Sequence, residues 1–271
     1  MARRRPRKSG ARRGDEKGIG WFIGVGIILL SVTAIIAIVV NRPEVPVLDP
    51  VTLCDQEKAP RKLISLIVDG TDSVSELHVA EVKKLTEQIV FEAPAYSRVD
   101  FYEISETGNH IKPFSMCIPP DGSEADELFE NPILMKRRFE EKFLTVFNET
   151  MARLLTQKPA KQSPIIESVQ SVAVEAMGVT PGSHHMILVS DLLQHSNKFS
   201  FYREKPNMPR YLEVNSNTGG MFAKLNNADV SILIIPRKMP MGRKSDLLEF
   251  WADWMQRSNA NPSKMEMEPL S

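Results

Sequence analysis

The feature that most constrains this chain is a stretch of 23 residues, 18–40, without a charged side chain. At a helical rise of about 1.5 Å per residue, such a stretch is long enough to cross a hydrocarbon core about 30 Å thick. It is too long for the apolar part of a cleaved signal peptide, and the residues after it, Val39 to Arg42, offer no small-residue cleavage site. The stretch therefore predicts a single transmembrane helix.

Basic residues before this stretch set its predicted orientation. Residues 1–17 hold eight of the 34 Lys and Arg but only two of the 34 Asp and Glu. By the positive-inside rule this tail stays in the cytoplasm, and the rest of the chain lies on the far side of the cell membrane, which is the periplasm in a bacterium. Beside a membrane span the tail is more simply a topology signal and a contact for anionic lipid than a nucleic-acid-binding arm. The other 254 residues carry 26 basic and 32 acidic side chains, so the basic charge is not a property of the folded domain.

Residues 41–60 are rich in proline and predict an extended linker between the membrane and the domain. The linker carries Cys54, and the chain's other cysteine is Cys117. On the oxidising side of a membrane such a pair favours a disulfide that would tie the linker to the sheet, the alternative being two buried free thiols. Within the span, Gly20 and Gly24 have the spacing of a helix-dimer contact, although glycines are common enough in spans for chance to explain them.

Residues 61–258 alternate between short apolar runs and amphipathic segments. Five runs predict strands, at 63–68, 98–105, 114–118, 185–191 and 229–236, the third as an antiparallel edge. Four segments predict helices, at 74–91, from 132, at 163–177 and at 244–257, and a weaker helix is expected at 211–225. This order gives an α/β fold with a doubly wound, mostly parallel sheet and helices on both faces. Residues 259–271 are expected to form a C-terminal tail.

The end of the first predicted strand carries a cluster of oxygen-bearing side chains. Asp69, Thr71 and Ser73 alternate as the chain leaves the strand, so that a carboxylate and two hydroxyls can turn toward one point. Oxygen ligands of this kind suit Mg²⁺ or Mn²⁺. Ser73 with Glu76 three residues later is also the pattern of a capping box for the following helix.

The Asp69-x-Thr71-x-Ser73 pattern resembles the metal-ion-dependent adhesion site of von Willebrand factor type A domains. The resemblance covers about residues 60–258 and implies two further ligands, a hydroxyl from Ser163 before an apolar helix and a second carboxylate from Asp191 at the end of a later strand. Each also has a simpler explanation, because Ser163 could cap its helix and Asp191 could start a loop. The family has six strands, one more than the five counted here.

The loop at 194–210 is long for an α/β connection and contains Phe199, Phe201 and Tyr202. Loops that follow parallel strands lie at the edge where α/β folds bind ligands, so these aromatic residues are expected to rim the metal site and contact a partner. Packing beneath the loop is the alternative.

The resemblance implies a binding module and not an enzyme: a bound ion with an open coordination position takes an acidic side chain from a protein partner, here within an envelope complex. A second hypothesis keeps the fold without the metal, as a structural scaffold. A third is a hydrolase in which Ser73 or Ser190 acts with His184, His185 or His195. The histidines show no recognisable spacing, His184 and His185 are expected at the surface, and the sequence has no Gly-x-Ser-x-Gly elbow.

Overall fold

The computed structural model describes residues 16–40, 46–108, 110–123, 125–126, 129–156, 160–176, 178, 183–216 and 220–270. These residues belong to two compact units, Met1–Val45 and Pro46–Ser271. Most of the basic tail and the first five residues of the predicted linker lie outside the described residues, so the predictions made for them stay predictions.

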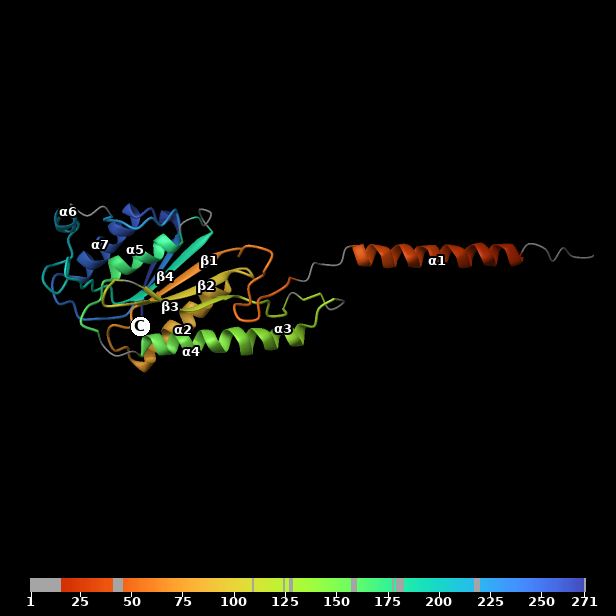
Figure 1. Cartoon of the computed structure of the whole chain (residues 1–271), viewed down its shortest axis with the longest axis horizontal. Coiled ribbons are helices and arrows are strands. Elements are labelled where there is room, and N and C mark those ends of the chain that lie inside the picture. Colours follow the sequence, from red (N-terminus) through yellow and green to blue (C-terminus); the bar gives the residue numbers. More distant parts are fainter. Residues whose placement is uncertain are drawn as a thin grey trace, which may run out of the picture. The chain divides into compact units, whose positions relative to one another are not determined.

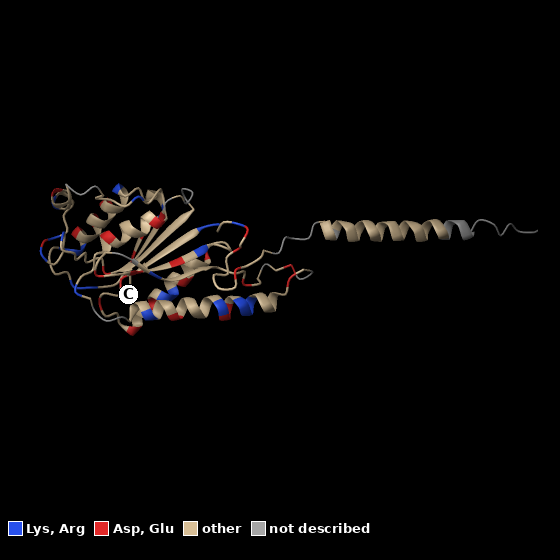
Figure 2. Cartoon of the chain, in the orientation of Figure 1, with Lys and Arg blue, Asp and Glu red and all other residues tan. Residues whose placement is uncertain are grey.

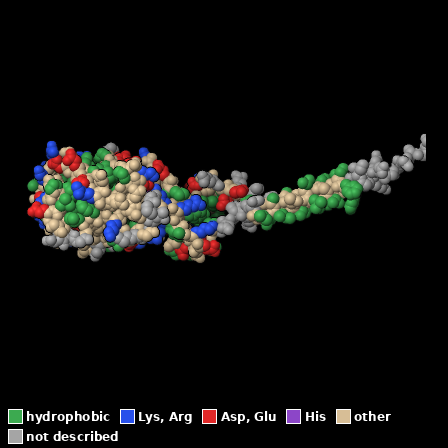
Figure 3. Space-filling model, turned by 90° about the horizontal axis from the view of Figure 1, so that it is seen from above, with side chains coloured by type: hydrophobic (Ala, Val, Ile, Leu, Met, Phe, Trp, Pro, Cys, Tyr) green, Lys and Arg blue, Asp and Glu red, His purple; other side chains and the backbone are tan. Residues whose placement is uncertain are grey.

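The first unit contains one helix, α1 (Glu16–Val40), which includes the stretch predicted to span the membrane. Its described side chains are mostly exposed and apolar, with Trp21 65% and Val40 75% accessible, and hydrophobic side chains cover the face visible in Figure 3. Among the residues that the structure describes, no helix is both long and apolar enough to cross a membrane.

The second unit is built on a six-stranded sheet in the order β3-β2-β1-β4-β5-β6 (Figure 1). Only the β2–β3 pair is antiparallel, which confirms the predicted mostly parallel sheet with an antiparallel edge. The strands are β1 (Leu63–Val68), β2 (Arg98–Ile104), β3 (His110–Cys117), β4 (His184–Ser190), β5 (Asp229–Ile234) and β6 (Met265–Pro269).

Helices cover both faces of this sheet, as predicted (Figure 1). One hydrophobic core lies between the sheet and α2 and α4, the other between the sheet and α5, α6 and α7. Charged residues lie mainly on helices and loops, while the central strands carry few of them (Figure 2). The helices are α2 (Glu76–Phe91), α3 (Pro132–Arg138), the π-helical turn η1 (Phe139–Leu144), α4 (Thr145–Leu155), α5 (Ile165–Glu175), α6 (Met208–Asn215), α7 (Lys244–Arg257) and the short 3-10 turn η2 (Pro262–Lys264).

A stripe of phenylalanines every four residues explains the π-helical turn between α3 and α4. Phe143 and Phe147 are fully buried and lie within 6.1 Å, ring to ring, of Phe114. A spacing of four exceeds the 3.6 residues of an α-helical turn, so a purely α-helical stripe would drift around the helix axis. The wider turn η1 corrects the drift and keeps the stripe on the sheet.

The domain is larger at both ends than the sequence predicted. The predicted C-terminal tail contributes β6, the sixth strand, because its alternating Met265-Glu266-Met267 lays one methionine face on the core while its glutamates face outward. At the other end, residues from Pro46 onward belong to the compact unit, where Leu53 is buried. The predicted disulfide between Cys54 and Cys117 is confirmed, and it fixes this segment to β3. The predicted helix at 211–225 is limited to α6, which ends at Asn215.

Candidate functional site

The candidate site lies where β1 and β4 end side by side. These strands are parallel neighbours, with Val68 paired with Val189, and the strand order reverses direction between them. Open α/β sheets bind ligands at such a switch point, outside the carboxyl ends of the strands. Asp69 directly follows β1 and Asp191 directly follows β4, so two carboxylates distant in sequence emerge at the same edge.

Asp69 is the centre of a buried hydrogen-bond cluster. Its Oδ1 accepts from the backbone N and the hydroxyl of Thr71, at 3.1 and 2.6 Å. Its Oδ2 accepts from the hydroxyls of Ser163 at 2.9 Å and Ser190 at 2.8 Å. Asp69 is 5% exposed, so the four donors replace the water that a carboxylate would otherwise need. The structure thus brings together three of the predicted ligands and adds the hydroxyl of Ser190.

Asp191 is the second carboxylate of the site and is incompletely satisfied. Its Oδ1 accepts from the backbone N of Leu193 at 2.8 Å, whereas its buried Oδ2 accepts no hydrogen bond. Burial, reinforced by the negative charge of Asp69, raises the pKa of Asp191 to about 7. The next residue, Leu192, has a φ of 64°, a left-handed conformation that is unusual outside glycine and is common beside functional sites.

Arg237 reaches the site from the segment after β5. Its Nε lies 3.3 Å from the free Oδ2 of Asp191, close enough for an ion pair although the N–H does not point at the oxygen. Its Nη2 donates to the carbonyl oxygen of Ser73 at 3.0 Å and lies 3.7 Å from Asp72. Arg237 was not predicted from the sequence, because no motif marks it and only the pairing of β4 with β5 brings its loop to this end of the strands.

Two of the simpler explanations for the predicted ligands are wrong. Ser75, not Ser73, caps α2, through a hydrogen bond from the backbone N of His78, while the side chain of Ser73 is exposed. Ser163 does not cap α5 either, because the residue at that cap is Pro164 and the Ser163 hydroxyl turns to Asp69. The hydroxyl of Ser163 is therefore free of a helical role.

The donor set fits a hard divalent cation. Asp69, Thr71, Ser163 and Asp191 supply carboxylate and hydroxyl oxygens, and the free Oδ2 of Asp191 is the kind of buried acceptor that an ion would satisfy. These residues, with the exposed Ser73, are those that would hold Mg²⁺ or Mn²⁺. No group of three or more His, Cys, Asp or Glu with the geometry of a metal site occurs among the described residues. The cluster has only two buried acids, Asp69 and Asp191, and its other oxygens belong to hydroxyls.

The aromatic loop is mostly part of the core. Phe199 and Phe201 are 1% and 0% exposed and pack against Phe250 of α7 at ring distances of 5.8 and 5.0 Å. The prediction that these two residues contact a partner is therefore wrong, because their rings fill the space beneath the loop. Tyr202 is 45% exposed and lies 5.0 Å, ring to ring, from His195. It is the one predicted aromatic contact that a partner can reach.

The histidines have structural partners. His184 is buried and shares a hydrogen bond with Ser65, and His185 shares one with Ser231 across the sheet. The prediction of surface histidines is wrong because both lie in β4, in the middle of the sheet. His195 shares a hydrogen bond with Ser200. Ser190, one of the two serines considered as a nucleophile, donates its described hydrogen bond to Asp69 and not to a histidine.

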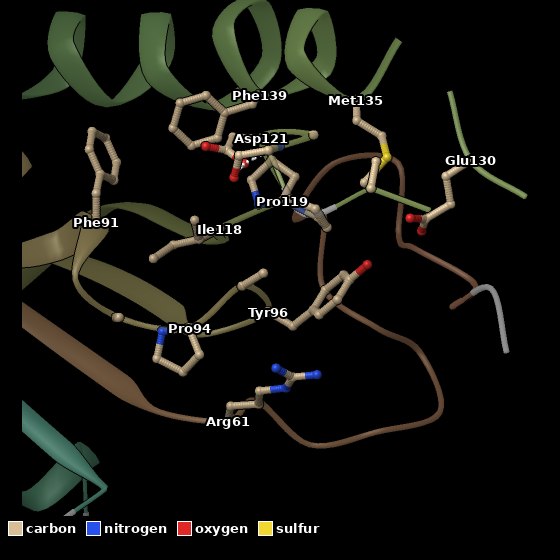
Figure 4. A pocket seen from close by; sticks show the side chains of 16 residues that line it. Arg61, Phe91, Pro94, Tyr96, Ile118, Pro119, Asp121, Glu130, Met135 and Phe139 are labelled. Atoms are coloured by element: carbon tan, nitrogen blue, oxygen red, sulfur yellow. Dashed lines mark hydrogen bonds between the residues drawn. The ribbon is translucent and has the colours of Figure 1, made fainter. Parts of the chain in front are cut away.

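A separate hollow lies at the opposite end of the strands, where β1 and β2 begin (Figure 4). It has a volume of about 530 Å³ and is open to solvent. Apolar side chains including Phe91, Ile118 and Phe139 form one wall, while Arg61 stacks over the ring of Tyr96 at 5.8 Å on the other. Its lining comes from three distant segments, so no local sequence pattern marks it.

Comparison with known proteins yields fold likenesses only. No protein-family model matches the sequence, and no curated protein matches it. The structure is similar to a von Willebrand factor type A protein from Catenulispora acidiphila, with 11% identity and a TM-score of 0.38 over 79% of this chain and 39% of that one. It is also similar to an aerotolerance-related membrane protein from Bacteroides fragilis with multiple mutations to serines, with 11% identity and a TM-score of 0.36 over 78% of this chain and 92% of that one. Both TM-scores are low, so the functional argument rests on the geometry of this chain.

Proposed function

We propose that this chain is a membrane-anchored interaction module that holds Mg²⁺ or Mn²⁺ between Asp69 and Asp191 and uses it to bind an acidic group of a protein partner. The observation that carries the proposal is the meeting of these carboxylates with the hydroxyls of Thr71 and Ser163 at the switch point of the sheet. Hydroxyl ligands are neutral, so the bound ion would keep positive charge and attract an anionic ligand.

The anchor and its orientation are parts of the same proposal. Residues 18–40 carry no charge and follow a strongly basic tail, which supports a span with the domain outside the cytoplasm. The disulfide between Cys54 and Cys117 supports an oxidising compartment for the domain. A bacterial periplasm and an envelope complex would meet these conditions.

A metal-free scaffold is the second candidate, and one observation favours it. Arg237 already places a positive charge 3.3 Å from Asp191, so the guanidinium alone partly offsets the buried carboxylate. On this alternative the cluster would stabilise the fold and bind no ion. We do not propose the hydrolase, because Ser190 donates to Asp69 and none of the described hydrogen bonds joins Ser73 or Ser190 to one of the three histidines.

Metal titration of the purified full-length chain in detergent separates the two candidates. Mn²⁺ binding is followed by electron paramagnetic resonance of the free ion, with Mg²⁺ as competitor, on the wild type and Asp191→Asn. The matched control is Asp253→Asn, which removes a carboxylate from the exposed face of α7, where it pairs with Arg257. We expect saturable binding in the wild type and control and its loss in Asp191→Asn. A folded wild type that binds neither ion at millimolar concentration would refute the metal-dependent function.

A further inference from the structure

The charges around the candidate site do not balance, and their sum indicates how the site works. Three carboxylates gather here, Asp69, Asp191 and the half-exposed Asp72, against the single guanidinium of Arg237. The guanidinium offsets only one carboxylate, so negative charge is left for a divalent ion to offset. Both cations would need the same oxygen.

That shared oxygen is Oδ2 of Asp191. It is buried and accepts no hydrogen bond, and among the described residues the cationic group beside it is the guanidinium of Arg237, whose Nε lies 3.3 Å away. The guanidinium is held from its other side, where Nη2 donates to the carbonyl oxygen of Ser73. It therefore joins the loop after β1 to the loop after β4.

Arg237 can leave this position without disturbing the core. Its side chain is 30% exposed, and its contacts, to Asp72, Asp191 and the Ser73 backbone, all lie in loops. A partly exposed ion pair of this kind is weak enough for a divalent ion to displace. Water and Asp72 can take up the displaced guanidinium at the rim.

We propose that Arg237 competes with the divalent ion for Oδ2 of Asp191. The guanidinium pairs with this oxygen when the ion is absent and must move away before the ion can bind. This inference rests on the proposed metal-dependent function and adds a residue that sets its affinity. The apparent affinity for the metal is reduced by the fraction of molecules in which Arg237 is away from Asp191, because only these molecules can bind the ion. The module would then bind metal firmly only at high ion concentration or when a partner also holds the ion.

The test compares Mn²⁺ affinity in full-length wild type, Arg237→Gln and Arg237→Lys in detergent, measured by electron paramagnetic resonance of free Mn²⁺. The control is Arg210→Gln on α6, an exposed arginine whose partners are Glu204 and Glu213. We expect Arg237→Gln to bind Mn²⁺ about five- to tenfold more tightly than the wild type, a change of about 1 kcal/mol in the free energy of binding. Arg237→Lys keeps the charge and loses the planar guanidinium, so its Mn²⁺ affinity should lie between those of the wild type and Arg237→Gln. The control should have the affinity of the wild type.

The outcomes distinguish this inference from the function on which it rests. Equal or weaker binding by Arg237→Gln, with saturable binding by the wild type, would overturn the competition and leave the metal site standing. Saturable binding by the wild type together with binding about fivefold or more tighter by Arg237→Gln would support the competition. If every folded variant fails to bind, both ideas are wrong and Arg237 is a permanent ion pair of a metal-free scaffold. Should Arg237→Gln fail to fold, the Arg237→Lys affinity decides, since competition requires it to exceed that of the wild type.

Discussion

Replacing Asp69 by alanine is expected to destabilise the fold even without any metal. The carboxylate accepts four hydrogen bonds, two from Thr71 and one each from Ser163 and Ser190. Hydrogen bonds to charged groups contribute about 1.5–3 kcal/mol each, and buried donors left without an acceptor cost about as much. Removing the charge also relieves repulsion with Asp191, which offsets part of the loss. We expect the free energy of unfolding to fall by about 3 kcal/mol.

Urea denaturation of the full-length chain in detergent with EDTA, followed by circular dichroism, measures this loss. The matched control is Asp72→Ala, because Asp72 is 44% exposed and its ion pair with Arg237 spans 3.7 Å. An exposed pair of that kind is worth at most about 1 kcal/mol. A loss below about 1 kcal/mol for Asp69→Ala would refute the reasoning that this carboxylate organises the cluster. Because Asp69→Ala is expected to destabilise the fold, a loss of metal binding in this variant cannot be assigned to a missing ligand. Asp191 accepts a single hydrogen bond, so replacing it disturbs the fold less and tests the metal site more directly.

Three further perturbations test other parts of the structure. Replacing Cys54 and Cys117 by serine opens a loop of 63 residues, and loop-closure entropy predicts that the free energy of unfolding, measured by urea denaturation, falls by about 4 kcal/mol. Under reducing conditions the wild type and this double variant should be equally stable. Burial lowers the pKa of His184 and of His185 from 6.5 to about 4, so the unfolded chain binds more protons at these residues and each should cost up to about 1.4 kcal/mol of stability per pH unit as the pH drops from 6.5 to 4. The raised pKa of Asp191 acts in the opposite direction and offsets part of this loss, so we expect a net fall in stability. A flat profile in the wild type would contradict this. Phe147→Ala removes a fully buried ring from the phenylalanine stripe and should cost about 3–5 kcal/mol of unfolding free energy, which the same denaturation assay measures.

The sequence alone determined those parts of the fold that local patterns encode. The mostly apolar runs at residues 63–68 and 229–236 predicted β1 and β5, because parallel strands that are buried on both faces consist largely of apolar residues. Asn131 and Pro132 marked the start of α3, since a capping side chain and a proline at the first helical position act within a few residues. The order of these elements was enough to predict a mostly parallel sheet covered on both faces.

Tertiary structure decided the features that depend on pairing between distant segments. Strand β6 is short and half polar, so its pattern resembles a tail until β5 supplies its hydrogen bonds. Phe199 and Phe201 have the same sequence pattern whether they rim a site or fill a core, and only the position of α7 shows that they are buried. The sequence could propose Asp69 and Asp191 as neighbours, but it could not reveal Arg237 beside Asp191. Its place follows from the alignment of β5 beside β4, a relation that no local pattern encodes.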